Sequence, residues 1–109
     1  MKYLVIAHDG KDSKATERRL AVREKHLKLA EKMYKDGKAI IGGAILDDNG
    51  SMVGSSRIVE FETRLELEEW LKNEPYVTGN VWEKVEVFPF RIAEIYDIGK
   101  PKTKGSSKG

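Results

Sequence analysis

Apolar residues alternate with polar ones, or form short apolar runs, in four segments, and they recur at helical spacing in two others. A helical pattern without proline covers residues 13–36 and stops at Gly37. A second helix is expected from Thr63 to about residue 73, because Thr63 and Glu66 fit a capping box. The predicted strands, bounded by turn residues, are 2–8, 39–46, 51–62 and 81–96.

The order of these elements predicts an α+β fold of the ferredoxin-like, split β-α-β-β-α-β type. It consists of a four-stranded antiparallel sheet with both helices on one face. Asn49-Gly50 is typical of a hairpin between the second and third strands. Pro89 cannot donate to a ladder, so the last strand is expected to be bulged or at an edge. Residues 74–80 are predicted to form a loop or a single short turn.

The sheet face without helices is also expected to be apolar. In the third strand Val53, Val59 and Phe61 point one way, whereas Met52 and Ile58 point the other way. A monomer would expose the second set to water, so we expect a homodimer that buries the open sheet face.

Composition narrows the class of protein. The 109 residues allow one domain, predicted at 1–97, followed by a disordered basic tail at 98–109. The net charge is only +2 and much of the excess lies in the tail, which argues against nucleic acid as the main partner. No cysteine is present, and neither a signal peptide nor a run of about 20 apolar residues is found. A cytoplasmic protein without membrane contact is expected.

Three basic side chains fall on the apolar side of the first predicted helix. At about 100° per residue, Arg19, Arg23 and His26 lie within an apolar arc. That arc consists of Leu20, Val22, Leu27, Leu29, Ala30, Met33 and Tyr34. Buried charge is unfavourable unless it is paired, so these side chains need acids or an anionic ligand. The candidates are Asp9, after the first strand, and Glu74, after the second helix.

A histidine held by a carboxylate is a proton-transfer pair, because the acid orients the ring and fixes its tautomer. Arginines beside such a pair would bind a substrate anion. The sequence therefore predicts a cleft in which His26, with Asp9 or Glu74, moves a proton, and in which Arg19 or Arg23 binds the substrate. Which acid is the partner stays open at this point.

Four segments resemble the YciI-like (YCII-related) family: "RRLAVREKHL" (18–27), "AIIGGAI" (39–45), "VGSSRIVEFET" (53–63) and "NEPYVTGNVWEKVEVFPF" (73–90). The resemblance covers residues 2 to about 92. It implies a ferredoxin-like homodimer of the dimeric α/β-barrel group with a histidine/aspartate pocket. The reactions of such proteins are mostly unassigned. At least one relative acts as a dehydrochlorinase on a chlorinated hydroxylated aromatic, so the resemblance is compatible with a reaction on a small molecule.

Carried over by position, the family histidine is His26, its upstream arginine is Arg23, and the aspartate after the first strand is Asp9. The family's Gly-Ser in the third strand matches Gly54-Ser55. Relatives commonly have Asp-Pro-Tyr where this chain has Glu74-Pro75-Tyr76, so the acid is longer here by one methylene.

Some relatives also have proline at the position of Glu24, which breaks the first helix. A break here would bring His26 close to Asp9, whereas a continuous helix makes that contact less favourable.

Three further residues complete the predicted site. Gly43 belongs to a glycine pair that lets a ligand or a neighbouring backbone approach the strand closely. Ser55 is expected to donate a hydrogen bond rather than act as a nucleophile. Tyr76 is expected either to cover the pocket or to pack beside it.

No recognisable set of metal ligands and no nucleotide fingerprint is present, so neither a metal nor another cofactor is expected. The leading hypothesis is a small cofactor-independent dimeric enzyme, or enzyme-like protein. It would perform proton abstraction, elimination or isomerisation on a small anionic or hydroxylated organic molecule. The alternative is a non-catalytic dimeric module that binds a metabolite or a protein.

Overall fold

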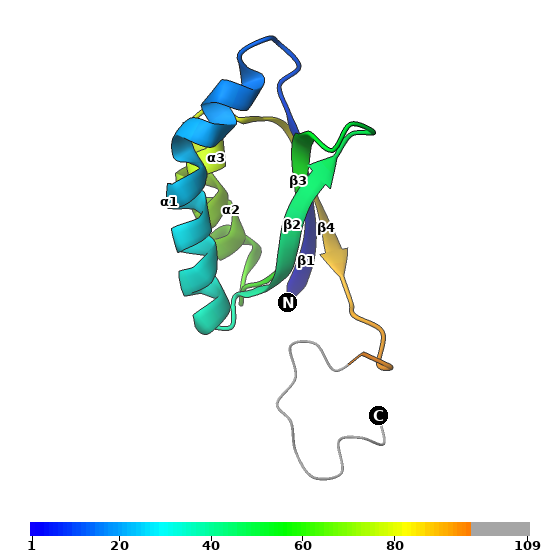
Figure 1. The fold of residues 1–109 in the computed structure, drawn as a ribbon. Coiled ribbons are helices and arrows are strands. Elements are labelled where there is room, and N and C mark those ends of the chain that lie inside the picture. The colour runs from blue at the N-terminus through cyan, green and yellow to red at the C-terminus, as the bar shows by residue number, and fades with distance from the viewer. Residues whose placement is uncertain (97–109) are drawn as a thin grey trace.

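In the computed structural model, which describes residues 1–96, a four-stranded sheet carries three helices on one of its faces (Figure 1). The strand order is β2-β3-β1-β4, and all neighbouring strands are antiparallel. The predicted ferredoxin-like α+β arrangement is therefore confirmed. The elements are β1 (Lys2–Asp9), α1 (Ala15–Lys35), β2 (Ala39–Leu46), β3 (Met52–Glu60), α2 (Arg64–Asn73), α3 (Pro75–Thr78) and β4 (Trp82–Phe90). The basic tail predicted at 98–109 lies outside the described residues.

Local features mark both ends of the first helix and the start of the second. The Asp12 side chain accepts a hydrogen bond from the backbone N–H of Lys14 at 3.2 Å, and α1 begins only at Ala15. Gly37, with φ 77°, takes the left-handed conformation that ends the helix. α2 begins at the predicted Thr63–Glu66 capping box, in which each side chain accepts a hydrogen bond from the backbone N–H of the other residue.

The last strand is shorter than the sequence pattern predicted. β4 ends at Phe90, opposite Lys2, where its partner β1 begins. Beyond Phe90 no strand remains to pair with, so the alternation that continues to residue 96 forms no ladder. Pro89 lies on an edge strand of the sheet, which confirms that part of the prediction.

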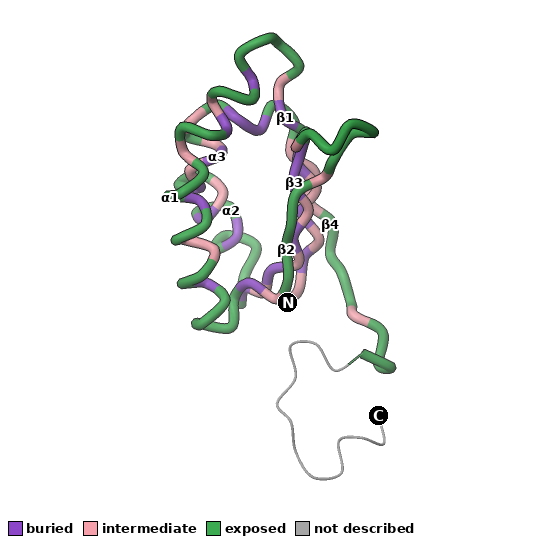
Figure 2. The backbone as a smooth tube through the Cα atoms, in the orientation of Figure 1, coloured by how far each residue is buried: buried purple, intermediate pink, exposed green. Residues whose placement is uncertain are grey.

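The core lies between the sheet and the helices. Alternate residues of β1 and β3 are buried beneath the helices, among them Tyr3, Val5 and Val59. Figure 2 marks buried stretches of the chain both in the sheet and in the helices beside it. Phe61 follows β3 and lies in the same layer, where its ring contacts that of Trp70. No helix of residues 1–96 is long and apolar enough to cross a membrane.

The opposite sheet face carries a row of apolar side chains across all four strands. The pairing of the strands aligns Ile41, Ile58, Leu4 and Phe88 in this order. Ile41 and Phe88 are exposed, and Leu4 and Ile58 are half-buried. The three helices leave this face uncovered (Figure 1). Both faces of the sheet are therefore apolar, as the alternation in β3 predicted.

Candidate functional site

Two buried ion pairs join α1 to the rest of the molecule, and the first is formed by Arg19 and Asp9. Arg19 Nη1 donates to both carboxylate oxygens of Asp9, at 2.9 and 2.8 Å. Arg19 Nη2 donates to Ser55 Oγ at 3.1 Å, and Trp82 Nε1 donates to the same oxygen at 3.2 Å. With two donors already on its oxygen, the Ser55 hydroxyl has its own proton left to donate.

The second buried pair is His26 and Glu74. His26 Nδ1 lies 2.5 Å from Glu74 Oε1, and the glutamate side chain is 0% exposed. A carboxylate at Nδ1 accepts the ring proton there, so in the neutral imidazole the lone pair is on Nε2. α1 is continuous through Glu24, and no hydrogen bond or ion pair joins Asp9 to His26 within residues 1–96. Of the two candidate acids, the structure brings Glu74 to the histidine and Asp9 to Arg19.

The segment Glu74-Pro75-Tyr76 explains why the acid is held so firmly. Glu74 is the C-cap of α2 and the N-cap of α3. Pro75 occupies the first position of α3, where a backbone N–H would have no partner within the helix, so proline is well tolerated there. Glu74 Oε1 accepts the backbone N–H of Tyr76 at 3.1 Å. The predicted loop therefore contains one short helix, and the cap of that helix also contacts the imidazole.

The aromatic ring of Tyr76 fixes the plane of the histidine. The two rings are stacked, with centroids 3.9 Å apart and an interplanar angle of 13°. Arg19 Cζ lies 4.7 Å from the centroid of the tyrosine ring. Burial raises the pKa of Tyr76 above its usual range, although Arg19 and Arg23 act in the opposite direction. The phenol therefore stays protonated at neutral pH and serves as a wall of the site.

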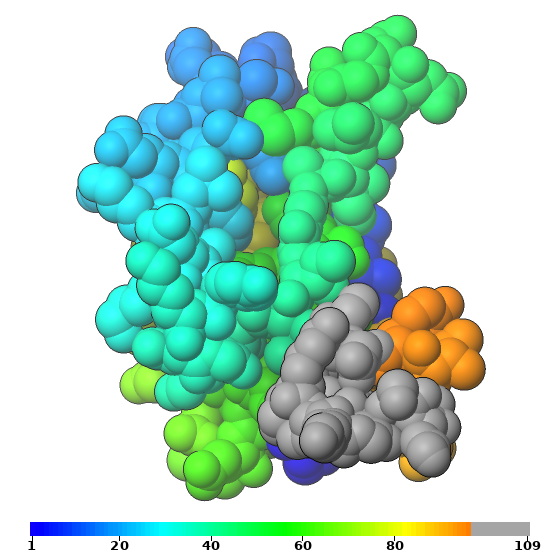
Figure 3. All heavy atoms as spheres, turned by 60° about the horizontal axis from the view of Figure 1, so that its bottom comes forward, coloured from blue at the N-terminus to red at the C-terminus, as the bar shows by residue number. Residues whose placement is uncertain are grey.

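A cavity of about 410 Å³ opens between α1 and β2 beside these residues. In the space-filling view, the slot lies between the blue-to-cyan α1 and the green β2, and yellow atoms of the α3 segment show at its bottom (Figure 3). Its polar lining consists of Arg19, Arg23, His26, Glu31, Ser55 and Arg57. Its apolar lining includes Leu27, Ala30, Ala44 and Met52. The cavity has the size and mixed lining of a small-molecule site.

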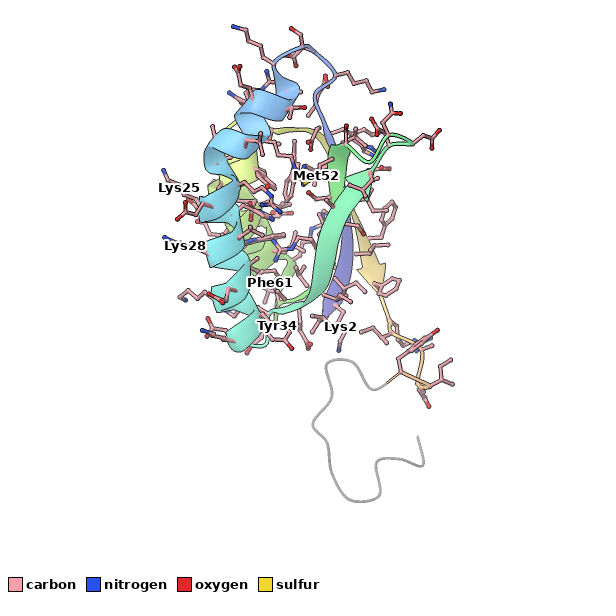
Figure 4. All side chains as sticks on the ribbon, in the orientation of Figure 1. Lys2, Lys25, Lys28, Tyr34, Met52 and Phe61 are labelled. Carbon is pink, nitrogen blue, oxygen red and sulfur yellow. The ribbon has the colours of Figure 1, made fainter. Side chains whose placement is uncertain are left out.

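Arg23 occupies the rim of this cavity. The sequence pattern placed its side chain within the apolar arc, but the residue is exposed, whereas Arg19 and His26 are buried. Within the described part of the chain, Arg23 forms no ion pair. The outer side of the helix carries lysines, and Lys25 and Lys28 point away from the sheet (Figure 4). Arg23 is therefore a cation available to an anion that enters the cavity.

The two glycines of the predicted pair contribute in different ways. Gly43 lines the cavity, and a Cβ added to it would meet no atom within 4 Å. A Cβ on Gly42, in contrast, would lie 3.1 Å from Cγ of Arg57. Gly42 thus leaves room for a buried arginine, and Gly43 forms part of the lining of the cavity.

Sequence reasoning missed Arg57, although alternation in β3 gives it the same direction as Ser55, Val59 and Phe61. Arg57 Nη1 lies 3.7 Å from Glu74 Oε2 and the residue is 5% exposed. Burial lowers the pKa of Arg57, and the Glu74 carboxylate partly opposes this shift.

His8, the other histidine, lies outside the cavity. It is exposed at the end of β1 and its Nε2 is 3.3 Å from Glu86 Oε1. Within residues 1–96 no group of three or more acidic or histidine side chains is arranged to hold a metal ion.

Comparisons with known proteins identify relatives along almost all of the described chain. Protein YciI of Escherichia coli (strain CFT073) is 34% identical over 97 residues, which cover 84% of this chain and 97% of the relative. An uncharacterized protein of Haemophilus influenzae matches with the same identity and coverage.

Among solved structures, the dehydrochlorinase TftG of Burkholderia phenoliruptrix AC1100, in complex with 2,5-dihydroxybenzoquinone, has a TM-score of 0.74. It is 22% identical, and the match covers 86% of this chain and 97% of that one, so the likeness concerns the fold. The profile of the YCII-related domain matches residues 1–91. The chain belongs to the YCII-related domain family.

Proposed function

We propose that the protein is a small enzyme that moves a proton on a small anionic or hydroxylated organic molecule, with His26 as the acid/base and Glu74 as the group that orients it. One observation carries the proposal: a buried histidine whose Nδ1 contacts a fully buried carboxylate also lines a cavity of about 410 Å³. Since Nδ1 is occupied by Glu74, Nε2 is the ring atom that meets the substrate.

The chemical step uses only side chains of the chain itself. His26 Nε2 takes a proton from a carbon or an oxygen of the substrate and becomes imidazolium beside Glu74. In one case the electron pair left behind moves into a neighbouring carbonyl group and gives an enolate. In the other case it forms a double bond, while a leaving group departs with the electrons of the bond that breaks. In the first case the imidazolium returns the proton at another carbon, and the result is an isomerisation. In the second case the imidazolium gives its proton to the leaving group or to water, and the result is an elimination.

The cations around the cavity define the substrate class. Arg23 has no ion-pair partner among residues 1–96 and lies at the rim, and the Ser55 hydroxyl has a proton to donate inside. A carboxylate or an enolate of the substrate would be bound by these two groups, while apolar side chains such as Ala44 and Met52 contact its carbon skeleton. In this assignment Arg19 positions Ser55 and Asp9 neutralises Arg19. Gly43 and Tyr76 form walls.

A substrate screen tests this proposal. Wild type and His26→Ala are assayed against small carboxylic acids and hydroxylated aromatics and quinones, including the 2,5-dihydroxybenzoquinone that TftG binds. Turnover by wild type that is lost in His26→Ala supports the enzyme. Thermal shifts without any turnover by wild type overturn it and support the alternative, a non-catalytic module that binds a metabolite through the same cavity.

The proposal includes a homodimer formed through the open sheet face. The apolar row Ile41–Ile58–Leu4–Phe88 crosses the whole sheet, and nothing within residues 1–96 covers it. A second copy related by a two-fold axis would present the same row and bury it. The folded unit in this assembly is the domain predicted at 1–97.

The dimer makes a direct prediction for Ile58, which lies in the middle of the row. Ile58→Lys places two unpaired charges in the interface, one from each copy, so we expect the dimer dissociation constant to rise at least about a thousandfold. Light scattering after gel filtration measures the mass of the particle. The matched control is Leu65→Lys on α2, where a side chain that is 75% exposed leaves the dimer intact. A monomeric wild type would contradict the proposal.

A further inference from the structure

Arg57 is the buried cation of the site whose position the sequence did not reveal. It lies on β3, between Val5 of β1 and Gly42 of β2 in the sheet register, and is 5% exposed. Its stem occupies the space left by the missing side chain of Gly42. Its guanidinium carbon lies 5.3 Å from the centroid of the Trp70 ring, within reach of a cation–π interaction. The neighbouring strands and the ring of Trp70 therefore restrict the position of this side chain.

The charged end of Arg57 faces the second oxygen of Glu74. Nη1 and Oε2 are 3.7 Å apart, and neither atom has a hydrogen-bond partner among residues 1–96. Oε1 of the same carboxylate already binds His26 and the N–H of Tyr76. One negative charge thus lies between a permanent cation and a histidine that can become a cation.

We propose that Arg57 is a positioning residue for His26: it neutralises Glu74 from the side opposite the imidazole and thereby weakens the binding of a proton to the ring. With Arg57 and Glu74 both charged, the buried group is already neutral when His26 carries no charge. A proton on His26 adds an uncompensated positive charge to three side chains that are all buried. Without Arg57, that proton instead compensates Glu74, so His26 binds it more readily. The catalytic meaning of this effect rests on the proposed function of His26.

Among the groups around His26, Arg57 is the cation that contacts the same carboxylate, that of Glu74. Tyr76 of α3 stacks on the ring and is protonated, and Trp82 of β4 contacts it edge-on without charge. Arg19, on the same helix as His26, is neutralised by Asp9 of β1. Arg23 is also on that helix and is exposed to solvent, which screens its charge.

The test is an NMR titration of the two histidine rings in protein labelled with ¹⁵N at the imidazoles. We expect Arg57→Met to raise the titration midpoint of His26 by about one pH unit, a tenfold increase in proton affinity. His8 is exposed and lies outside the cavity, so its midpoint stays unchanged and serves as a reference in the same sample. Arg57→Lys keeps the charge and returns the His26 midpoint toward that of wild type.

Arg57→Gln is the second neutral variant, and it gives the answer if Arg57→Met does not fold. A His26 midpoint within about 0.3 pH units of wild type in a folded neutral variant overturns the role of Arg57, because a side chain that only packs would leave it there. The acidic limb of the pH–rate profile is expected to move with the NMR midpoint. The titration needs no turnover, so it decides the role of Arg57 even if the substrate screen finds no reaction.

Discussion

His26→Gln is expected to lower the turnover number of the protein about 10²–10⁴-fold, the range that general acid/base groups contribute. Glutamine can still donate a hydrogen bond to Glu74 from its amide, so the buried carboxylate keeps a partner at that position. It cannot take up a proton near neutral pH. Binding is expected to change little, because Arg23 and Ser55 hold the substrate in the proposed site.

Steady-state kinetics on a substrate identified by the screen separate these effects. The expected result is a low turnover number with a Michaelis constant close to that of wild type. The matched control is His8→Gln, which replaces the exposed histidine beside Glu86 and should leave both constants unchanged. If His26→Gln retains more than about a tenth of wild-type turnover, His26 is not the proton carrier.

The fold could be predicted from the sequence because its signals are local. Alternation in the strands, the Thr63–Glu66 capping box and the Asn49-Gly50 turn each determine short segments, and their order leaves one common topology. The end of β4 could not be predicted in the same way. It depends on where β1 begins, and a strand without a partner forms no ladder whatever its own pattern.

For the site, the helical wheel gave the direction of side chains but not their depth. Arg19 and His26 are buried as expected, whereas Leu20, Leu27 and Tyr34 of the same arc are largely exposed. The buried residues of α1 form a narrow line along the helix, and the cavity lies beside it. Depth depends on the distance between the helix and the sheet, which no local pattern encodes.

The acidic partner could not be chosen from the sequence because two acids lie near the same end of the sheet. Continuity of α1 decides between them: it places Arg19 at Asp9 and His26, two turns later, at Glu74. The family's aspartate is a glutamate here, and the longer side chain bonds His26 with one oxygen and faces Arg57 with the other. The replacement of the family's aspartate by Glu74 and the buried Arg57 therefore belong to the same set of contacts.

Glu74→Ala is expected to lower the free energy of unfolding by about 3–5 kcal/mol, the range for breaking a buried ion pair by removing one partner. The carboxylate is 0% exposed, and its removal takes three interactions away at once. Arg57 is left as a buried charge without a counter-charge, His26 loses the acceptor for Nδ1, and Tyr76 loses the cap of its N–H. Urea unfolding followed by the fluorescence of Trp70 and Trp82 measures the change.

The matched control is Glu69→Ala on α2, where the carboxylate is 65% exposed and lies 3.6 Å from Lys72. Exposed pairs contribute little, so this variant should stay within about 0.5 kcal/mol of wild type. Combining Glu74→Ala with Arg57→Met should recover part of the loss, because the uncompensated charge leaves together with its partner. A Glu74→Ala protein within about 1 kcal/mol of wild type would show that water solvates the guanidinium and the imidazole, contrary to a buried site.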